Sequence, residues 1–161
     1  MLIKLIETVR IAGACLGIYF AYRLGMDSPA PAQAVLHIIS PWLLVSIAGI
    51  SGVEGLLFPK LAAKEKGFEQ GSNYQRQSAI ALLSYAAIAL LVYFADLGTG
   101  AEIAIVSAFA FFILFSAVNH AWQSIAHKNY RWANLNRPFL TIGLLAALWY
   151  PLLHSLLPYL R

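Results

Sequence analysis

The chain has 161 residues, of which 60% are hydrophobic and 11% are charged, and its formal net charge is +4. A soluble domain usually carries about 25% charged residues, so this composition excludes an ordinary soluble fold and predicts a lipid bilayer as the solvent. The basic residues stand in short stretches between apolar runs, which favours contact with anionic lipid headgroups over a nucleic-acid partner. The length suits a single domain over residues 1–161.

Five apolar segments predict the fold class. A membrane-spanning helix needs about 20 mostly apolar residues, and five segments reach or approach that length. They predict an all-α, polytopic membrane bundle of five transmembrane helices, with four spanning helices plus one interfacial helix as the alternative. In chain order the segments are residues 5–24, 35–58, 78–94, 103–125 and 139–157.

The first segment is the weakest of the five because charged residues interrupt it. Lys4, Glu7 and Arg10 are three residues apart, so they share one helix face. On that face they can pair or extend toward the headgroups while the rest of the helix inserts. This spacing favours insertion of the first segment.

Prolines stand inside the second and fifth segments. Pro41 cannot donate to the carbonyl of His37, so we expect the helix either to kink there or to begin there. Pro151 frees the carbonyl of Ala147 in the same way.

Basic residues are divided unevenly between the two sides of the predicted bundle. Five spans place the N-terminus and the second and fourth connections on one side, where nine lysines and arginines fall, against two on the other. The positive-inside rule predicts a multi-pass protein of the cell inner membrane with its N-terminus in the cytoplasm. The nine are Lys4, Arg10, Lys60, Lys64, Lys66, Arg76, Lys128, Arg131 and Arg137, and the two are Arg23 and Arg161.

Glu54 is the first functional candidate, because ionisable residues at membrane depth are costly and rare. It lies within two turns of the connection that begins at Lys60. It either reaches that interface and pairs with a lysine, or belongs to a site. Small residues around it predict close approach of a neighbouring helix. The glycines with such spacing are Gly49, Gly52 and Gly55 here, and Gly13 and Gly17 in the first segment.

A polar stripe follows the fourth segment at spacings of three and four, so one helix face collects its members. Amides that face lipid would lack partners, so the stripe must point into the bundle or at a wet cavity. It either forms interhelical hydrogen bonds or lines a pocket in the cytoplasmic half of the membrane. The stripe is Ser116, Asn119, His120, Gln123 and His127, and the ligand-binding candidates are Glu54, Gln75, Asn119, His120, Gln123 and Asn134.

Motifs for metals, nucleophiles and cofactors are missing from the sequence. His120 and His127 are two turns apart, which is not the spacing of helical metal ligands, so no metal site is predicted. Cys15 has no nearby base, and no glycine pattern for phosphate or dinucleotide binding occurs. The cofactor and any catalytic residue therefore stay unknown from sequence.

The order of several short motifs resembles a known family. The motifs are Gly52-Val53-Glu54-Gly55-Leu56, Tyr74-Gln75, Asn119-His120, Asn129, Asn134 and Pro151. They resemble a family of small bacterial integral membrane proteins catalogued only as a domain of unknown function, over about residues 50–153. That family typically has Gly-His at Asn119-His120 and often a further histidine at Phe58-Pro59-Lys60, which weakens any family-wide metal site here. The resemblance implies fold and topology only.

Two functions fit these observations. The leading hypothesis is a non-enzymatic protein that binds a partner helix, a lipid or a small amphipathic molecule in the polar cavity. The alternative is a membrane enzyme acting on a lipophilic substrate of the quinone or isoprenoid type, with Glu54 and His120 at similar depth as an acid/base pair. The expected partners are the lipid bilayer, a second copy or a membrane-complex subunit, and a lipophilic small molecule.

Overall fold

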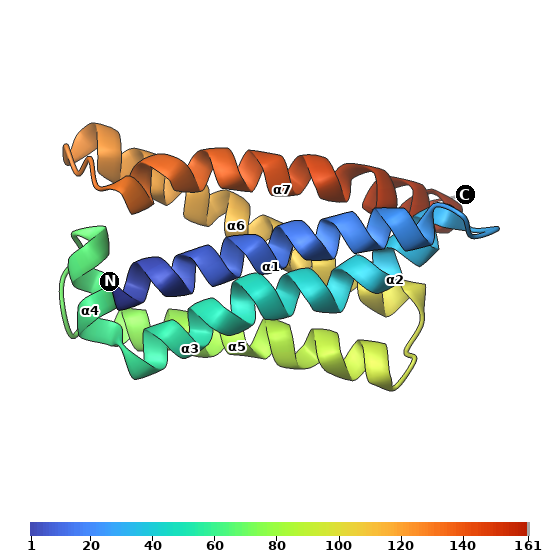
Figure 1. Cartoon of the computed structure of the whole chain (residues 1–161), viewed down its shortest axis with the longest axis horizontal. Helices are drawn as coiled ribbons and strands as arrows, with labels where there is room; N and C mark the ends of the chain where they lie inside the picture. The colour runs from blue at the N-terminus through green and yellow to red at the C-terminus, as the bar shows by residue number, and fades with distance from the viewer. Residues whose placement is uncertain (161) are drawn as a thin grey trace.

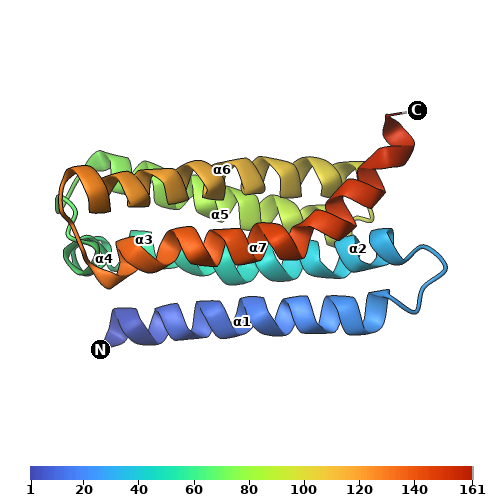
Figure 2. The same cartoon turned by 90° about the horizontal axis from the view of Figure 1, so that it is seen from above.

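A computed structural model describes residues 1–160 as a bundle of long helices, with no strand in that range. Five long helical rods form the bundle, and one of them is built from α2, η1 and α3 in succession. Figures 1 and 2 show the rods running lengthwise beside one another. The elements are α1 (Leu2–Gly25), α2 (Pro31–Leu43), the π-helical turn η1 (Leu44–Gly49), α3 (Ile50–Leu57), α4 (Pro59–Lys66), α5 (Asn73–Phe94), α6 (Thr99–Ala126), α7 (Trp132–Leu156) and the 3-10 turn η2 (Leu157–Tyr159).

Four of these rods are long and apolar enough to cross a membrane, namely Pro31–Leu57, Asn73–Phe94, Thr99–Ala126 and Trp132–Tyr159. The prediction of an all-α, polytopic membrane bundle is confirmed. The charged helix α1 is not among the four, but it lies lengthwise against α2 and not across an end of the bundle (Figures 1 and 2). That placement suits a fifth spanning helix better than an interfacial one.

The helices α5 and α7 begin earlier than their apolar runs. α5 starts at Asn73, five residues before the predicted segment, with the Ser72 side chain accepting a hydrogen bond from the Tyr74 amide at 3.2 Å. α7 starts at Trp132, seven residues before the predicted segment. The short helix α4 was not predicted at all. In each case polar residues are frequent among the helical residues, so a search for long apolar runs misses them.

The two prolines have different consequences. The helix runs through Pro41, so of the two alternatives a start at Pro41 is excluded. The π-helical turn η1 follows three residues later and widens the helix locally. Pro151 lies inside α7, whose C-terminal part bends in Figure 2, and the carbonyl of Ala147 accepts a hydrogen bond from Tyr22 Oη at 2.7 Å. The carbonyl that proline leaves free is thus satisfied by α1.

Glycines bring the helices into close contact as predicted. A Cβ atom built on Gly52 would lie 2.6 Å from Leu83 Cγ and 2.8 Å from the Ala79 carbonyl oxygen, both on α5. A Cβ on Gly13 would lie 2.9 Å from Ser46 Oγ. Helix α5 therefore packs almost directly on the backbone of α3, and α1 packs closely on η1 in the middle of the second rod.

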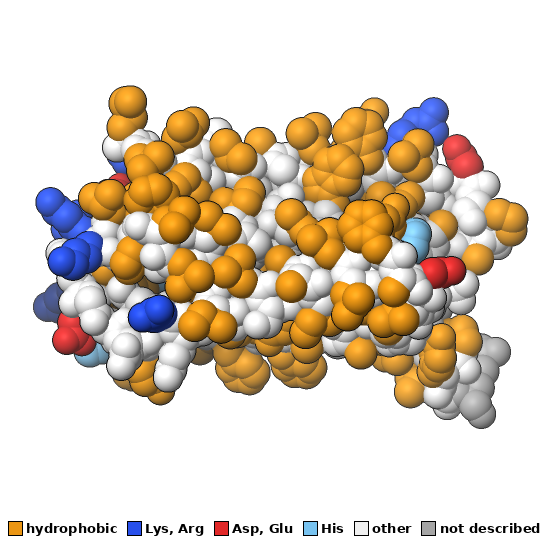
Figure 3. Space-filling model, turned by 90° about the horizontal axis from the view of Figure 1, so that it is seen from below, with side chains coloured by type: hydrophobic (Ala, Val, Ile, Leu, Met, Phe, Trp, Pro, Cys, Tyr) orange, Lys and Arg blue, Asp and Glu red, His pale blue; other side chains and the backbone are white. Residues whose placement is uncertain are grey.

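The apolar core and the basic residues occupy different parts of the bundle. Leu36 and Ile39 of α2, Phe109 of α6 and Leu148 of α7 are fully or almost fully buried. The N-terminus, α4 and the α6–α7 connection share one end, and most lysine and arginine side chains visible in Figure 3 gather at that end. We call it the basic end. Arg161, predicted on the opposite side, lies outside the described residues.

Candidate functional site

Glu54 is held by two cationic side chains, Arg10 and Lys66, at the basic end of the bundle. Its carboxylate is 1% exposed, and Arg10 Nη1 donates to Oε2 at 3.1 Å. Arg10 Nη1 also donates to Ser51 Oγ at 2.8 Å, while Lys66 Nζ lies 3.3 Å from Glu54 Oε1. The charge of Glu54 is therefore neutralised inside the protein, which supports the interpretation of a paired carboxylate.

Two charged side chains of α1, those of Glu7 and Arg10, point into the bundle. Arg10 is 6% exposed, and its Nη2 lies 3.9 Å from Glu7 Oε1. Glu7 Oε1 in turn accepts a hydrogen bond from Asn136 Nδ2 at 3.3 Å. These contacts explain how an apolar helix accommodates both charges: each has an internal partner, so neither needs to face lipid.

A second network of amides joins α4 to α6 and α7. Asn134 is fully buried, and its Oδ1 lies 2.7 Å from His120 Nδ1. Asn134 Nδ2 donates to the carbonyl of Lys66 at 3.1 Å, and Asn129 Nδ2 donates to the same carbonyl at 3.0 Å. These bonds fix the C-terminal end of α4 against the rest of the bundle. For His120 and Asn134, interhelical hydrogen bonding is thus observed directly.

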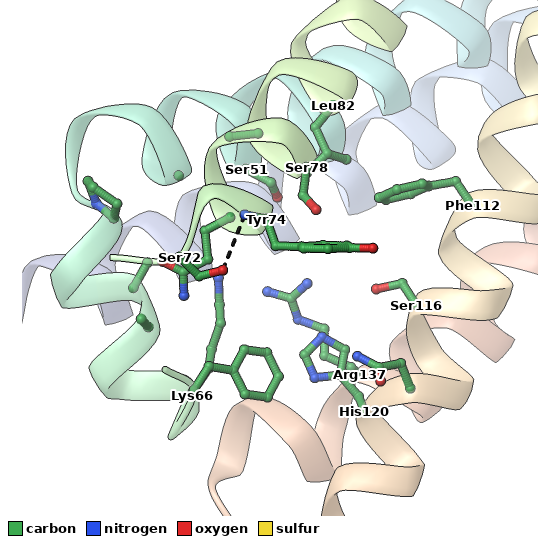
Figure 4. Close-up of a pocket in the computed structure, with 18 of the residues that line it drawn as sticks. Ser51, Lys66, Ser72, Tyr74, Ser78, Leu82, Phe112, Ser116, His120 and Arg137 are labelled. Atoms are coloured by element: carbon green, nitrogen blue, oxygen red, sulfur yellow. Dashed lines mark hydrogen bonds between the residues drawn. The ribbon is translucent and has the colours of Figure 1, made fainter. Parts of the chain in front are cut away.

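A polar cavity of about 390 Å³ lies beside these networks and is walled by α3 to α7 (Figure 4). We call it the polar cavity. Side chains with hydrogen-bonding groups dominate its wall, and Glu69 at its edge is exposed. The polar residues of the wall are Ser51, Lys66, Glu69, Ser72, Tyr74, Gln75, Ser78, Ser116, Asn119, His120 and Arg137.

Arg137 is the feature of this cavity that has no internal explanation. It is half-buried, and among residues 1–160 its guanidinium forms no side-chain hydrogen bond or ion pair. Figure 4 shows it projecting from α7 into the space between Tyr74, Ser116 and His120. A guanidinium carries five N–H donors in a planar fork. Glu7 and Glu54 act on the charge of Arg137 from beyond ion-pair distance, so its N–H donors are left for an acceptor that enters the cavity.

The cations of the polar cavity influence one another. Burial lowers the pKa of the Lys66 ammonium below its usual range, the positive charge of Arg137 lowers it further, and Glu54 acts in the opposite direction. Lys66 and Arg137 are therefore near enough to repel each other. An anion placed between them would relieve this repulsion.

The six predicted ligand-binding residues divide into two sets. Gln75, Asn119 and His120 line the polar cavity, and the buried Oε1 of Gln75 has no hydrogen-bond partner among residues 1–160. Glu54, Gln123 and Asn134 do not line it. Within the described residues no hydrogen bond or ion pair joins Glu54 to His120, so the structure does not make them the predicted pair.

Sequence analysis missed the three cations that dominate this end. Arg10 was expected either to pair on its own helix face or to extend toward the headgroups, Lys66 was one of several connection lysines, and Arg137 was placed outside the fifth span. The available signal was the spacing of Glu7 and Arg10, which already indicated one charged face on α1. Recognising Arg137 required knowing that α7 begins about two turns earlier than its apolar run.

A second polar cluster, also missed, lies at the opposite end. His37 Nδ1 lies 2.5 Å from Glu102 Oε1, and Glu102 is 4% exposed. The His37 ring stacks on Tyr93 with a centroid distance of 4.7 Å. The cluster links α2, α5 and α6. Residues 1–160 contain no group of three histidine, cysteine or acidic side chains placed to hold a metal ion.

The comparisons with known proteins identify a family but no activity. The pattern of a family of unknown function, DUF6790, matches residues 6–157. The chain belongs to this family. The match extends well beyond residues 50–153, on which the resemblance in the sequence rested. It covers Arg137, which lies within that range, and also Arg10, which lies before it. No curated protein and no solved structure matches the chain.

Proposed function

We propose that this DUF6790 protein binds a small amphipathic molecule in the polar cavity and is not an enzyme. One observation carries the proposal: Arg137 projects into a cavity of about 390 Å³ with no acidic partner among residues 1–160. Cavities of about 300–1,000 Å³ with a few convergent polar groups are typical of small-molecule sites. Hydroxyl and amide groups of Ser78, Ser116 and Asn119 add such polar groups around the guanidinium.

We further propose that the basic end faces the cytoplasm and that the protein resides in the cell inner membrane. The uneven division of lysine and arginine supports this orientation through the positive-inside rule. The polar cavity then opens in the cytoplasmic half of the bilayer. A ligand could reach it from the inner leaflet or from the cytoplasm.

The enzymatic alternative has less support from the described contacts. An acid/base pair must exchange protons with the substrate and be within hydrogen-bonding reach of it. Glu54 is instead occupied by Arg10 and Lys66 and does not line the polar cavity, whereas His120 is hydrogen-bonded to Asn134. Binding is therefore the better proposal.

The proposal is tested by filling the cavity. Ser78 lies on α5 in the wall of the polar cavity, and Ser84 lies further along the same helix, exposed and outside the wall of that cavity. Native mass spectrometry of freshly extracted protein should show a bound small molecule on the wild type and on Ser84→Phe. It should be lost from Ser78→Phe. Equal occupancy of the two variants, or no bound mass on the wild type, would contradict the proposal.

A further inference from the structure

A second cavity, of about 360 Å³, lies between α1, α6 and α7. We call it the apolar groove. It reaches exposed residues of α7, including Phe139 and Leu140, which places its mouth against the surrounding lipid. Most of its wall is aliphatic. The aliphatic residues from the three helices are Ile11, Ala14, Ile18, Ile113, Ala117, Leu140 and Leu144.

The apolar groove and the polar cavity meet at Arg137. Ile47, Ile113, Ser116 and Arg137 line both of them. Arg137 therefore stands at the boundary between a polar chamber and an apolar one. A molecule with a charged head and an alkyl chain could place its head in one and its chain in the other.

The charges at this boundary favour an anion. Arg10 also lines the apolar groove, but Glu54 and Ser51 already occupy its guanidinium. Around this boundary lie three buried or half-buried cations, Arg10, Lys66 and Arg137, against two carboxylates, Glu7 and Glu54, which leaves one positive charge in excess. Exposed Glu69 at the edge of the polar cavity is in contact with water, which screens it.

We propose that the ligand is a single-chain amphiphile with a phosphate head, its phosphate bound by Arg137 in the polar cavity and its alkyl chain in the apolar groove. This inference rests on the proposed function, which it deepens by naming the ligand class. A guanidinium binds phosphate through two parallel hydrogen bonds. Ser78, Ser116 and Tyr74 offer further hydroxyl groups to the remaining phosphate oxygens. The groove is at the small end of the ligand-site range, which favours one chain over two.

Cys15 supplies a built-in reporter for the groove. It is the single cysteine of the chain, it is exposed, and it lines the apolar groove. An alkyl chain in the groove should therefore slow its alkylation by N-ethylmaleimide. A matched control is Ile142→Cys in a Cys15→Ser background, because Ile142 is 65% exposed on α7 and lies outside the groove wall.

The test uses three probes in neutral maltoside micelles. Oleoyl lysophosphatidic acid has the head and the chain, monooleoylglycerol has only the chain, and glycerol 3-phosphate has only the head. The lysophosphatidic acid is expected to slow alkylation of Cys15 with an affinity at least about tenfold above that of either partial probe, the factor that loss of one charge-assisted contact produces. The alkylation rate of the Ile142→Cys control should not change.

Two variants assign the effect to the two chambers. Arg137→Gln should remove the advantage of lysophosphatidic acid over monooleoylglycerol without lowering the unfolding temperature, because Arg137 has no acidic partner to strand. Gly143→Leu should abolish protection by the lysophosphatidic acid, since Gly143 lines the groove and a Cβ there meets no atom within 4 Å. Arg137→Lys should recover part of the affinity through charge alone.

The outcomes separate this inference from the proposed function. Equal binding of monooleoylglycerol would reject the phosphate head while leaving an amphipathic ligand in place. Equal binding of glycerol 3-phosphate would reject the chain. An undiminished advantage of lysophosphatidic acid over monooleoylglycerol in Arg137→Gln, or lysophosphatidic acid binding seen by mass without protection of Cys15, would also overturn the inference. If none of the three probes binds and the wild type carries no endogenous ligand, the proposed function itself is rejected.

Discussion

Arg10 Nη1 lies 3.1 Å from Glu54 Oε2, although 44 residues separate the two in the chain. The bond joins α1 to α3 at the basic end, in a place where both side chains are almost fully buried. Charges removed from solvent are stable only with a partner, so α1 and α3 are held in one register at this point.

Removing only one member of this pair should destabilise the bundle. Arg10→Met leaves Glu54 with Lys66 alone, and we expect a loss of about 2 kcal/mol or more in the free energy of unfolding in detergent. The double variant Arg10→Met/Glu54→Met should lose less than the sum of the two single variants. Arg23→Met on the same helix should change stability by no more than about 0.5 kcal/mol, because its ion pair with Asp27 is exposed. Additive effects at Arg10 and Glu54 would contradict the buried pair.

Glu54 and His120 should behave differently, since no bond joins them. In a double-mutant cycle with Glu54→Gln and His120→Gln, we expect a coupling energy below about 0.5 kcal/mol, as for independent sites. Unfolding in the same detergent gives the values. A coupling above about 1 kcal/mol would revive the acid/base pair and with it the enzymatic alternative.

The His37–Glu102 bond predicts a second coupled pair at the opposite end. His37→Phe keeps a ring against Tyr93, and Glu102→Gln keeps the size of the side chain, so the cycle isolates the bond itself. We expect a coupling of about 1 kcal/mol or more, because a hydrogen bond to a charged group is stronger than a neutral one. His154→Phe combined with Glu102→Gln is the control and should be additive. Similar coupling energies in both cycles would contradict a specific His37–Glu102 bond.

Glycine replacements should separate close packing from open space. Gly52→Leu would place a side chain within 3 Å of Leu83 and the Ala79 carbonyl, so overpacking should cost about 1–3 kcal/mol or more. Gly143→Leu meets no neighbour at its Cβ and should be close to the wild type. Thermal unfolding in detergent compares the two. Equal midpoints would mean that α3 and α5 are not in backbone contact.

The proposed topology can be tested by labelling from each side of the membrane. Single cysteines at exposed Arg76 and Lys128, in a Cys15→Ser background, should react with an impermeant maleimide only in inverted vesicles or permeabilised cells. A cysteine at Asp27, in the α1–α2 connection, should react in intact cells. The reverse pattern would place the basic end outside.

The spans were predictable from sequence because a bilayer imposes a simple requirement. A helix of about 20 apolar residues satisfies its backbone internally, so the runs around Leu43, Ala89 and Phe109 identify themselves. Close glycine contacts were also predictable, because small residues spaced along one helix, such as Gly52 and Gly55, allow a neighbouring backbone to approach closely.

The composition of the site was harder to predict. Apolar runs end where polar helical turns begin, so Arg137 was assigned to a connection although it lies in the second turn of α7. The bond between His37 and Glu102 depends on how two helices are shifted along each other, which one sequence does not contain. The partners of Glu54 likewise come from α1 and α4, at distances of 44 and 12 residues.

The π-helical turn η1, at Leu44–Gly49, changes how the second rod tolerates altered length. Such a turn accommodates one residue more than an α-helix would while the helical segments on either side keep their orientation. A uniform helical wheel through residues 31–57 would thus misplace Glu54 by about 100° relative to Leu36. Deleting one residue within 44–49 would let the wide turn revert to an ordinary one, with the apolar core and the Arg10–Glu54 bond both kept. A deletion within α5 has no such reserve and would rotate every residue beyond it onto a new face.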